Sequence, residues 1–171
     1  LGEFFGMDLD RIADFLGHLE QQANGLRLLV ETPIIADTQD AQIEAFVGLK
    51  QRIRSHGHSV GIIVDEWCNT FEDVKKFADA EAADYIQVKA PDLGGLNNTI
   101  DSLLYCKRTG TGAYLGGSGN ETDQSTRTSA HVALACQADI LIAKPGQGVD
   151  EALMIERNEM NRTLALIAAR A

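Results

Sequence analysis

A regular alternation of short apolar runs with helical patterns constrains the fold of this 171-residue chain more than any other feature. Runs such as LRLLVE and VGIIVD contain three or more consecutive apolar residues, as strands buried on both faces do. The sequence predicts five strands, at residues 26–31, 60–65, 84–89, 112–117 and 139–144. Strands that alternate with helices in this way run parallel and are joined by right-handed crossovers.

Apolar residues recur at helical spacing between these runs. A first helix is predicted before any strand, at residues 8–23, where Asn24-Gly25 provides a stop signal. Each strand is then followed by a helical pattern, at residues 38–56, 72–80, 96–107, 122–135 and from 150 onward. The chain is therefore predicted to consist of a leading helix and five strand-helix units.

Two architectures accept this pattern, the open doubly wound sheet and the closed (β/α)8 barrel. No strand is followed by GxGxxG or by GxxxxGK[ST], so neither a dinucleotide site nor a P-loop is indicated. Glu31, Asp65, Lys89 and Ser118 each lie at or just after the end of a consecutive strand. In a barrel these ends converge on the catalytic face, so the sequence favours part of a TIM-type barrel, with five of the eight strands that close one.

Composition excludes several classes of partner. With 25 acidic and 15 basic side chains, the formal charge of −10 disfavours nucleic acids and anionic membrane surfaces. No window approaches the roughly 18 apolar residues of a membrane helix. The three cysteines match no zinc motif and no disulfide framework, which favours a reducing cytoplasm. A chain that begins Leu1-Gly2, without an initiator methionine, is interpreted as a fragment of a longer protein.

The residues at the strand ends indicate metal-assisted chemistry. Glu31 and Asp65 are carboxylates at matching ends of adjacent strands, and hard oxygen ligands of this kind bind Mg²⁺. The alternative is that each is a solvated strand-end acid. Lys89 ends the next strand, and Gln87 shares its face because side chains alternate along a strand. Beside a dication in a low-dielectric mouth, the pKa of Lys89 is expected to fall, which suits a base; the alternative is an ion pair with a neighbouring carboxylate.

Several segments resemble the methylaspartate ammonia-lyase family of the enolase superfamily. They are VDEWCNT (64–70), IQVKAPDLGG (86–95), GGSGNET (116–122), AKPGQGVDE (143–151) and NEMNRTLAL (158–166). The resemblance extends over essentially all 171 residues and corresponds to the C-terminal part of the family's chain. It implies that residues 1–171 are the C-terminal portion of an enolase-type barrel, with an N-terminal capping domain and the first barrel strands upstream.

The resemblance also implies an activity and its site residues. The family reversibly eliminates ammonia from L-threo-3-methylaspartate to give mesaconate in glutamate degradation, with Mg²⁺ and a monovalent cation, usually K⁺, as a cytoplasmic homodimer. By this resemblance Glu31 and Asp65 are two of three metal ligands, Lys89 is the base that takes the C3 proton, and Gln87 contacts the substrate. The third metal carboxylate and a histidine for the opposite substrate face would lie upstream of Leu1.

The chain departs from the family pattern at two places. Ser118-Gly119 stands where the family usually has Thr-Cys, a pair that contacts the substrate, so the range of 3-substituents is open. Thr32 stands where a glycine is common. Two alternatives to the ammonia-lyase interpretation remain: another enolase-superfamily lyase or dehydratase, and a truncated half-barrel without activity.

Overall fold

A computed structural model describes residues 1–144 and 146–170 of the chain; Pro145, within one of the quoted motifs, and Ala171 lie outside the described residues. The described residues form one five-stranded parallel sheet with the order β1-β2-β3-β4-β5. Its strands are β1 (Leu29–Glu31), β2 (Gly61–Val64), β3 (Tyr85–Val88), β4 (Gly112–Leu115) and β5 (Ile140–Leu141). Each strand pairs with the next along the chain, whereas a doubly wound sheet reverses its strand order. The sheet is therefore a curled half-barrel, as the sequence predicted.

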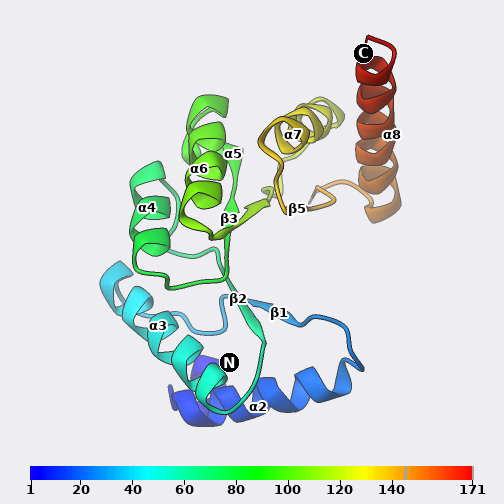
Figure 1. Cartoon of the computed structure of the whole chain (residues 1–171). Helices are drawn as coiled ribbons and strands as arrows, with labels where there is room; N and C mark the ends of the chain where they lie inside the picture. The colour runs from blue at the N-terminus through cyan, green and yellow to red at the C-terminus, as the bar shows by residue number, and fades with distance from the viewer. Residues whose placement is uncertain (145, 171) are drawn as a thin grey trace.

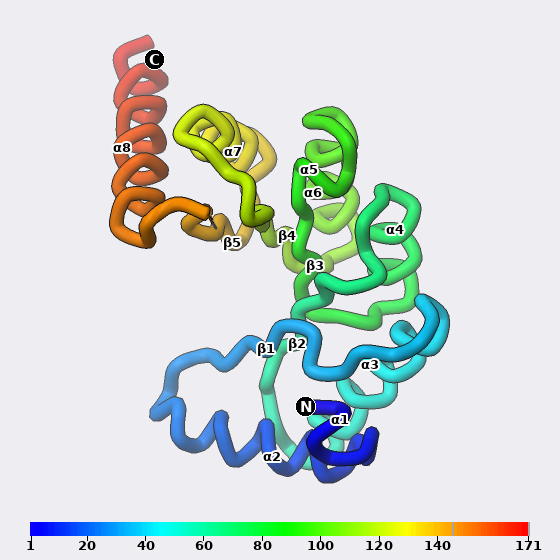
Figure 2. The backbone as a smooth tube through the Cα atoms, turned by 180° about the vertical axis from the view of Figure 1, so that it is seen from behind, coloured from blue at the N-terminus to red at the C-terminus, as the bar shows by residue number. Residues whose placement is uncertain are grey.

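The helices cover the outer side of this sheet. They are α1 (Gly2–Phe5), α2 (Leu9–Gln22), α3 (Gln39–Ser55), α4 (Phe71–Asp79), α5 (Ala90–Leu93), α6 (Leu96–Thr109), α7 (Asp123–Cys136) and α8 (Val149–Ala168). In Figures 1 and 2 the larger helices follow one another around the outside of an arc, and the strands lie on its inner side. Among the described residues, no helix is both long and apolar enough to cross a membrane.

Four helices begin at a side-chain cap where the sequence predicted a helix start. Asp8 accepts hydrogen bonds from the backbone N–H groups of the first turn of α2. Thr38, Thr70 and Thr122 do the same at the starts of α3, α4 and α7. Each cap satisfies N–H groups that have no partner within the helix, and losing one costs about 1 kcal/mol.

The core lies between the sheet and the helices. All four residues of β2 are buried, and the outer faces of β3 and β4 contribute further apolar side chains. Phe46 of α3 and Phe77 of α4 meet edge to face, with ring centroids 6.4 Å apart. Each fully buried aliphatic or aromatic side chain of this size contributes roughly 1.5–3 kcal/mol. The three cysteines are buried free thiols.

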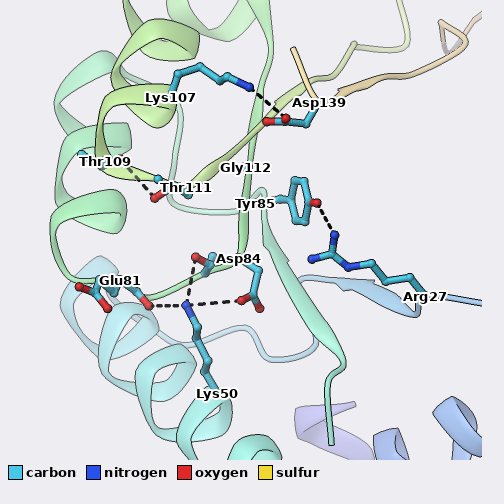
Figure 3. Close-up of a pocket in the computed structure, with 12 residues that line it drawn as sticks. Arg27, Lys50, Glu81, Asp84, Tyr85, Lys107, Thr109, Thr111, Gly112 and Asp139 are labelled. Atoms are coloured by element: carbon cyan, nitrogen blue, oxygen red, sulfur yellow. Dashed lines mark hydrogen bonds and ion pairs between the residues drawn. The ribbon is translucent and has the colours of Figure 1, made fainter. Parts of the chain in front are cut away.

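The N-terminal ends of the strands are joined by two aspartates (Figure 3). Asp84 precedes β3, accepts the N–H of Ile62 in β2 at 2.8 Å and pairs with Lys50 of α3 at 3.5 Å. Asp139 precedes β5, accepts the N–H of Ala113 in β4 at 2.8 Å and pairs with Lys107 of α6 at 3.0 Å. These contacts tie strands to one another and to the helices at the end of the sheet opposite the expected catalytic face.

The predicted elements differ from the observed ones mainly at strand ends. The first strand begins at Leu29 rather than residue 26, the fourth ends at Leu115, and the last shrinks to Ile140–Leu141. The two four-residue helices, α1 and α5, were not predicted. Backbone hydrogen bonds continue for a residue beyond some of these ends, from Gly116 N–H to Val88 and from Ile142 N–H to Leu115.

Candidate active site

Three neighbouring strands bring their polar residues to one edge of the sheet. Glu31 is the last residue of β1, Asp65 follows β2, and Lys89 follows β3. Because the strands are parallel and in consecutive order, their C-terminal ends lie side by side. The Nζ atom of Lys89 lies 2.5 Å from Oδ1 of Asp65. The structure therefore brings together the residues that the sequence placed at the catalytic face.

Asp65 is a candidate ligand for a cation. Its side chain is 16% exposed. Its Oδ1 atom is buried and lies 2.5 Å from the ammonium group of Lys89. Two carboxylates at adjacent strand ends, Asp65 and Glu31, are a donor set suited to a hard cation. Among the described residues, no group of three or more His, Cys, Asp or Glu side chains lies close enough together to hold a metal ion.

Lys89 contacts two carboxylates rather than one. As the N-cap of α5 it begins a short turn that returns Asp92 to within 3.0 Å of its Nζ. Burial of the amine opposes its charge, but the contacts with Asp65 and Asp92 outweigh burial and raise the pKa of Lys89. The lowered pKa expected from the sequence was argued for Lys89 beside a bound dication, and it stays a prediction. The ion pair offered as the alternative interpretation is present.

Glu31 shows that the two proposed metal ligands are close enough to repel each other. Although the residue as a whole is exposed, partial desolvation of its carboxyl group raises the pKa of Glu31, and repulsion from Asp65 adds to that effect. Gln87 and Lys89 partly offset the shift. Two carboxylates that repel each other are stabilised by a cation placed between them.

Gln87 lies on the inner face of β3 and is 4% exposed. A Cβ atom on Gly116, in the adjacent strand connection, would collide with the Gln87 side chain. Glycine at position 116 thus leaves the room that Gln87 occupies. The position of Gln87 agrees with the face predicted from the two-residue period.

Ser118 and Gly119 follow β4, one strand further along the same edge. The backbone N–H of Ser118 donates to Oε1 of Glu121 at 3.2 Å. A Cβ atom on Gly119 would meet nothing within 4 Å, so open space lies beside this residue. Among the hydrogen bonds of the described residues, none joins Ser118 or Gly119 to the three polar strand-end residues.

Sequence reasoning missed one residue on the inner face. Tyr114 of β4 pairs in register with Gln87 of β3 and is 6% exposed. Burial raises the pKa of Tyr114 to about 12, and the charges of Glu31 and Asp65 add to the shift. In the sequence, Tyr114 is recognisable only as a polar aromatic residue within an apolar run. The face of the sheet on which it lies depends on the strand register, which the sequence does not fix.

Comparison with known proteins places these residues in a family. The sequence model described as "Methylaspartate ammonia-lyase C-terminus" matches residues 1–169. Methylaspartate ammonia-lyase 2 of Carboxydothermus hydrogenoformans is 48% identical over 170 residues, which cover 99% of this chain and 41% of that protein. The chain thus spans about two fifths of the length of its curated relatives.

Solved structures agree with the sequence comparison. The Mg complex of β-methylaspartase from Clostridium tetanomorphum superimposes with a TM-score of 0.95 and 43% identity, over 99% of this chain and 41% of that one. Muconate lactonizing enzyme from Pseudomonas putida, a member of the enolase superfamily, matches 62% of this chain and 27% of its own, with a TM-score of 0.52 and 27% identity. The chain therefore belongs to the methylaspartate ammonia-lyase family and corresponds to the C-terminal part of its relatives.

Proposed function

We propose that these residues form the C-terminal part of an Mg²⁺-dependent active site that reversibly eliminates ammonia from L-threo-3-methylaspartate to give mesaconate. The observation that carries the proposal is the convergence of Glu31, Asp65 and Lys89 at three consecutive strand ends, in a chain of this family. We further propose that the complete polypeptide acts in cytoplasmic glutamate degradation as a homodimer, and that it uses K⁺ as a monovalent cation.

Glu31 and Asp65 are the proposed metal ligands. Both are oxygen donors at the ends of adjacent strands, and they are close enough for the charge of Asp65 to raise the pKa of Glu31. Bound Mg²⁺ would supply positive charge to the substrate carboxylate next to the C–H bond that breaks. A third carboxylate and the histidine for the opposite substrate face are proposed to come from the upstream part of the complete polypeptide.

Lys89 is the proposed base. Its unprotonated Nζ accepts the proton from C3 of the substrate, the electrons of that bond form the C2–C3 double bond, and the C2–N bond breaks to release ammonia. In the structure, Asp65 and Asp92 favour the charged form of Lys89. Neutralising the charge of Asp65 weakens that effect and moves Lys89 towards the form that can accept a proton.

Gln87, Ser118 and Gly119 are the proposed substrate contacts. Gln87 presents a buried amide on the inner face, and Ser118 presents a hydroxyl at the next strand end. An amide and a hydroxyl can bind the amino-acid substrate's carboxylates without carrying a charge of their own. The open space beside Gly119 leaves room for the 3-substituent or for a larger group.

The test is an assay of the complete polypeptide that contains residues 1–171. We expect absorbance from mesaconate when L-threo-3-methylaspartate is supplied with Mg²⁺, and none after chelation. A parallel panel of sugar acids and cycloisomerase substrates identifies the other enolase-superfamily reactions. Turnover of a panel member without mesaconate formation would overturn the ammonia-lyase assignment, and no turnover of any substrate would favour a non-catalytic half-barrel.

A further inference from the structure

Lys144 is a buried lysine whose ammonium group has no direct counter-ion. It follows β5 and is only 2% exposed. Its Nζ donates a hydrogen bond of 2.5 Å to the carbonyl oxygen of Gly116, and it forms no ion pair with any residue in the described part of the chain. Removing a charged group from water without a paired counter-ion destabilises the folded state. Packing alone does not account for a lysine at this position.

Two carboxylates face Lys144 from other elements, Glu121 from the loop after β4 and Glu156 from α8. Burial lowers the pKa of Lys144, and these two negative charges oppose that effect. Glu156 is 4% exposed, and its Oε1 atom lacks a hydrogen-bond partner among the described residues. Burial raises the pKa of Glu156 to about 7, while Lys144 acts in the opposite direction. The three side chains, of which Lys144 and Glu156 are buried and Glu121 is half-buried, are called here the Lys144 cluster.

The Lys144 cluster holds both ends of the segment 116–119. The N–H of Gly116 donates to the carbonyl of Val88 at 2.9 Å, which continues the β3–β4 ladder, and its own carbonyl accepts from Lys144. At the other end, Ser118 N–H donates to Oε1 of Glu121. The second oxygen of Glu121 accepts from the hydroxyl of Ser125 in α7 at 2.5 Å. The segment is thus anchored to β3, β5 and α7.

The same segment forms part of the proposed substrate site. The backbone of Gly116 lies directly against the Gln87 side chain, because a Cβ atom at position 116 would overlap it. At the far end, a Cβ atom on Gly146 would collide with the carbonyl oxygen of Gly119. The chain just beyond Lys144 therefore packs on the residue next to Ser118. A shift of Lys144 would move both the support of Gln87 and the Ser118 hydroxyl.

We propose that Lys144 is a positioning residue that acts through the Gly116 carbonyl to hold segment 116–119 against Gln87 for substrate binding. This inference rests on the proposed function, which assigns Gln87 and Ser118 to the substrate. A charged donor makes a shorter and stronger hydrogen bond to a carbonyl than a neutral donor does. The buried ammonium thus holds the backbone of a glycine-rich segment that has few side chains with which to pack.

The decisive variant is Lys144→Met in the complete polypeptide, which keeps the length of the side chain and removes the donor and the charge. We expect KM for methylaspartate to rise about 10- to 100-fold with a smaller change in kcat, because displacing contact groups by about 1 Å has effects of this size. Amide hydrogen exchange in residues 116–121 should accelerate. The Tm is measured in parallel to detect global destabilisation, because removing Lys144 leaves the buried Glu156 without the positive charge that faces it.

Lys107→Met is the matched control. Lys107 pairs with Asp139 at 3.0 Å at the opposite end of the strands, so its loss should lower the Tm slightly and leave KM and the exchange of residues 116–121 unchanged. A second variant, Lys144→Met with Glu156→Gln, covers the case in which an unpaired Glu156 destabilises the single variant. It should show the same rise in KM and the same faster exchange.

Wild-type KM and wild-type exchange in both Lys144 variants would overturn the proposal. A lower Tm with faster exchange along the whole chain would also overturn it, because Lys144 would then be purely structural. If the wild-type polypeptide does not turn over methylaspartate at all, the proposed function is wrong. The exchange of residues 116–121 still decides whether Lys144 positions that segment.

Discussion

Lys89 is held in place by two carboxylates, and as the proposed base it also has to accept a proton. Asp65 lies 2.5 Å and Asp92 3.0 Å from its Nζ, and both favour the ammonium form. The same pair of contacts fixes the direction of the amine. Geometry and protonation state are therefore controlled by the same two side chains.

Replacing Lys89 by alanine tests its role as the base. The Lys89→Ala variant of the complete polypeptide should lose solvent deuterium exchange at C3 of the substrate and turn over at least about 10²-fold more slowly, since general-base catalysis contributes this much. Mass spectrometry of the recovered substrate measures the exchange. Lys75→Ala, on α4 where Lys75 pairs with Glu72 at 2.6 Å, is the control and should behave as the wild type. Wild-type exchange in Lys89→Ala would place the base elsewhere.

Neutralising either proposed metal ligand should abolish metal binding and leave the fold intact. Glu31→Gln and Asp65→Asn keep the shape of each side chain but remove a negative charge from the pair. Calorimetric titration with Mg²⁺ should give little or no heat in either variant, while the Tm without metal changes by little because both groups lie at strand ends. Mg²⁺ binding with wild-type affinity in either variant would exclude that residue as a ligand.

The space beside Gly119 predicts how this chain's substrate range can be narrowed. A Cβ atom there meets nothing within 4 Å, so Gly119→Cys should fold with wild-type stability. The added thiol fills room near Ser118 and should lower kcat/KM for substrates with larger 3-substituents by about tenfold relative to methylaspartate, as pocket-filling changes of this size do. Competition assays with 3-alkyl aspartates measure the ratio. An unchanged ratio would show that Gly119 does not face the 3-substituent.

At the scale of elements, one carboxylate joins the last two helices. Glu159 of α8 is 3% exposed and accepts hydrogen bonds from Arg162 of its own helix and from His131 and Arg127 of α7, the latter two at 2.6 and 3.1 Å. Contacts with Arg162, then His131 and Arg127, lower the pKa of Glu159 to about 2. The position of α8 on α7 thus depends on an ionised Glu159.

The pH dependence of stability follows from this shift. A carboxyl group with a lowered pKa in the folded state stabilises the fold fully above its unfolded pKa of about 4.3 and loses that contribution as the pH falls towards about 2. The free energy of unfolding should therefore fall more steeply below pH 4.3 in the wild type than in Glu159→Gln. Denaturant titrations at several pH values measure both slopes. Equal slopes would show that Glu159 does not link protonation to stability.

The elements were predictable where a long pattern and a local stop or start signal agreed. The helix predicted at 38–56 is α3, Gln39–Ser55. Thr38 caps it, as expected for a threonine that directly precedes a helical pattern. The helix α5 was missed because four residues give no period to read, and its turn is stabilised by tertiary placement after β3. Long helices are therefore predictable from the local sequence pattern, whereas short helices depend on tertiary contacts.

Some residues of the candidate site were likewise predictable from the sequence, and others were not. The convergence of Glu31, Asp65 and Lys89 was predictable because parallel strands in consecutive order place their ends together. The position of Tyr114 was not, since it depends on the pairing of β3 with β4. Nor was the burial of Lys144, because its hydrogen-bond partner, Gly116, is distant in the sequence. The positions of these two residues depend on contacts between segments distant in sequence, which the pattern of a single strand does not reveal.

At the scale of the whole molecule, the half-barrel has two open edges. β1 and β5 each pair on one side only, so N–H and C=O groups on their outer sides have no strand partner within the described sheet. One side of α8 also exposes apolar side chains, namely Val149, Leu153, Met154, Leu164 and Ile167. Unpaired strand edges and apolar surface both favour association with other chains.

Residues 1–171 expressed alone should therefore associate. Light scattering should detect oligomers or aggregates whose population rises with protein concentration. Calorimetry should show weak Mg²⁺ binding, because two carboxylates leave the ion with more water ligands, and no mesaconate should form from methylaspartate. A monomeric, well-folded segment with the turnover of the complete polypeptide would contradict this prediction and show that the upstream residues are dispensable.

The consecutive order of the strands also has a consequence for how the chain reaches its fold. Each strand pairs with the next strand along the chain, as Leu29 pairs with Gly61 and Tyr85 with Gly112. Within the described chain, no strand pairs with a strand from the far end of the sequence. The entropy lost in closing the loop between two paired strands is therefore small and similar from one unit to the next. Such a chain can add one β–α unit after another as it leaves the ribosome.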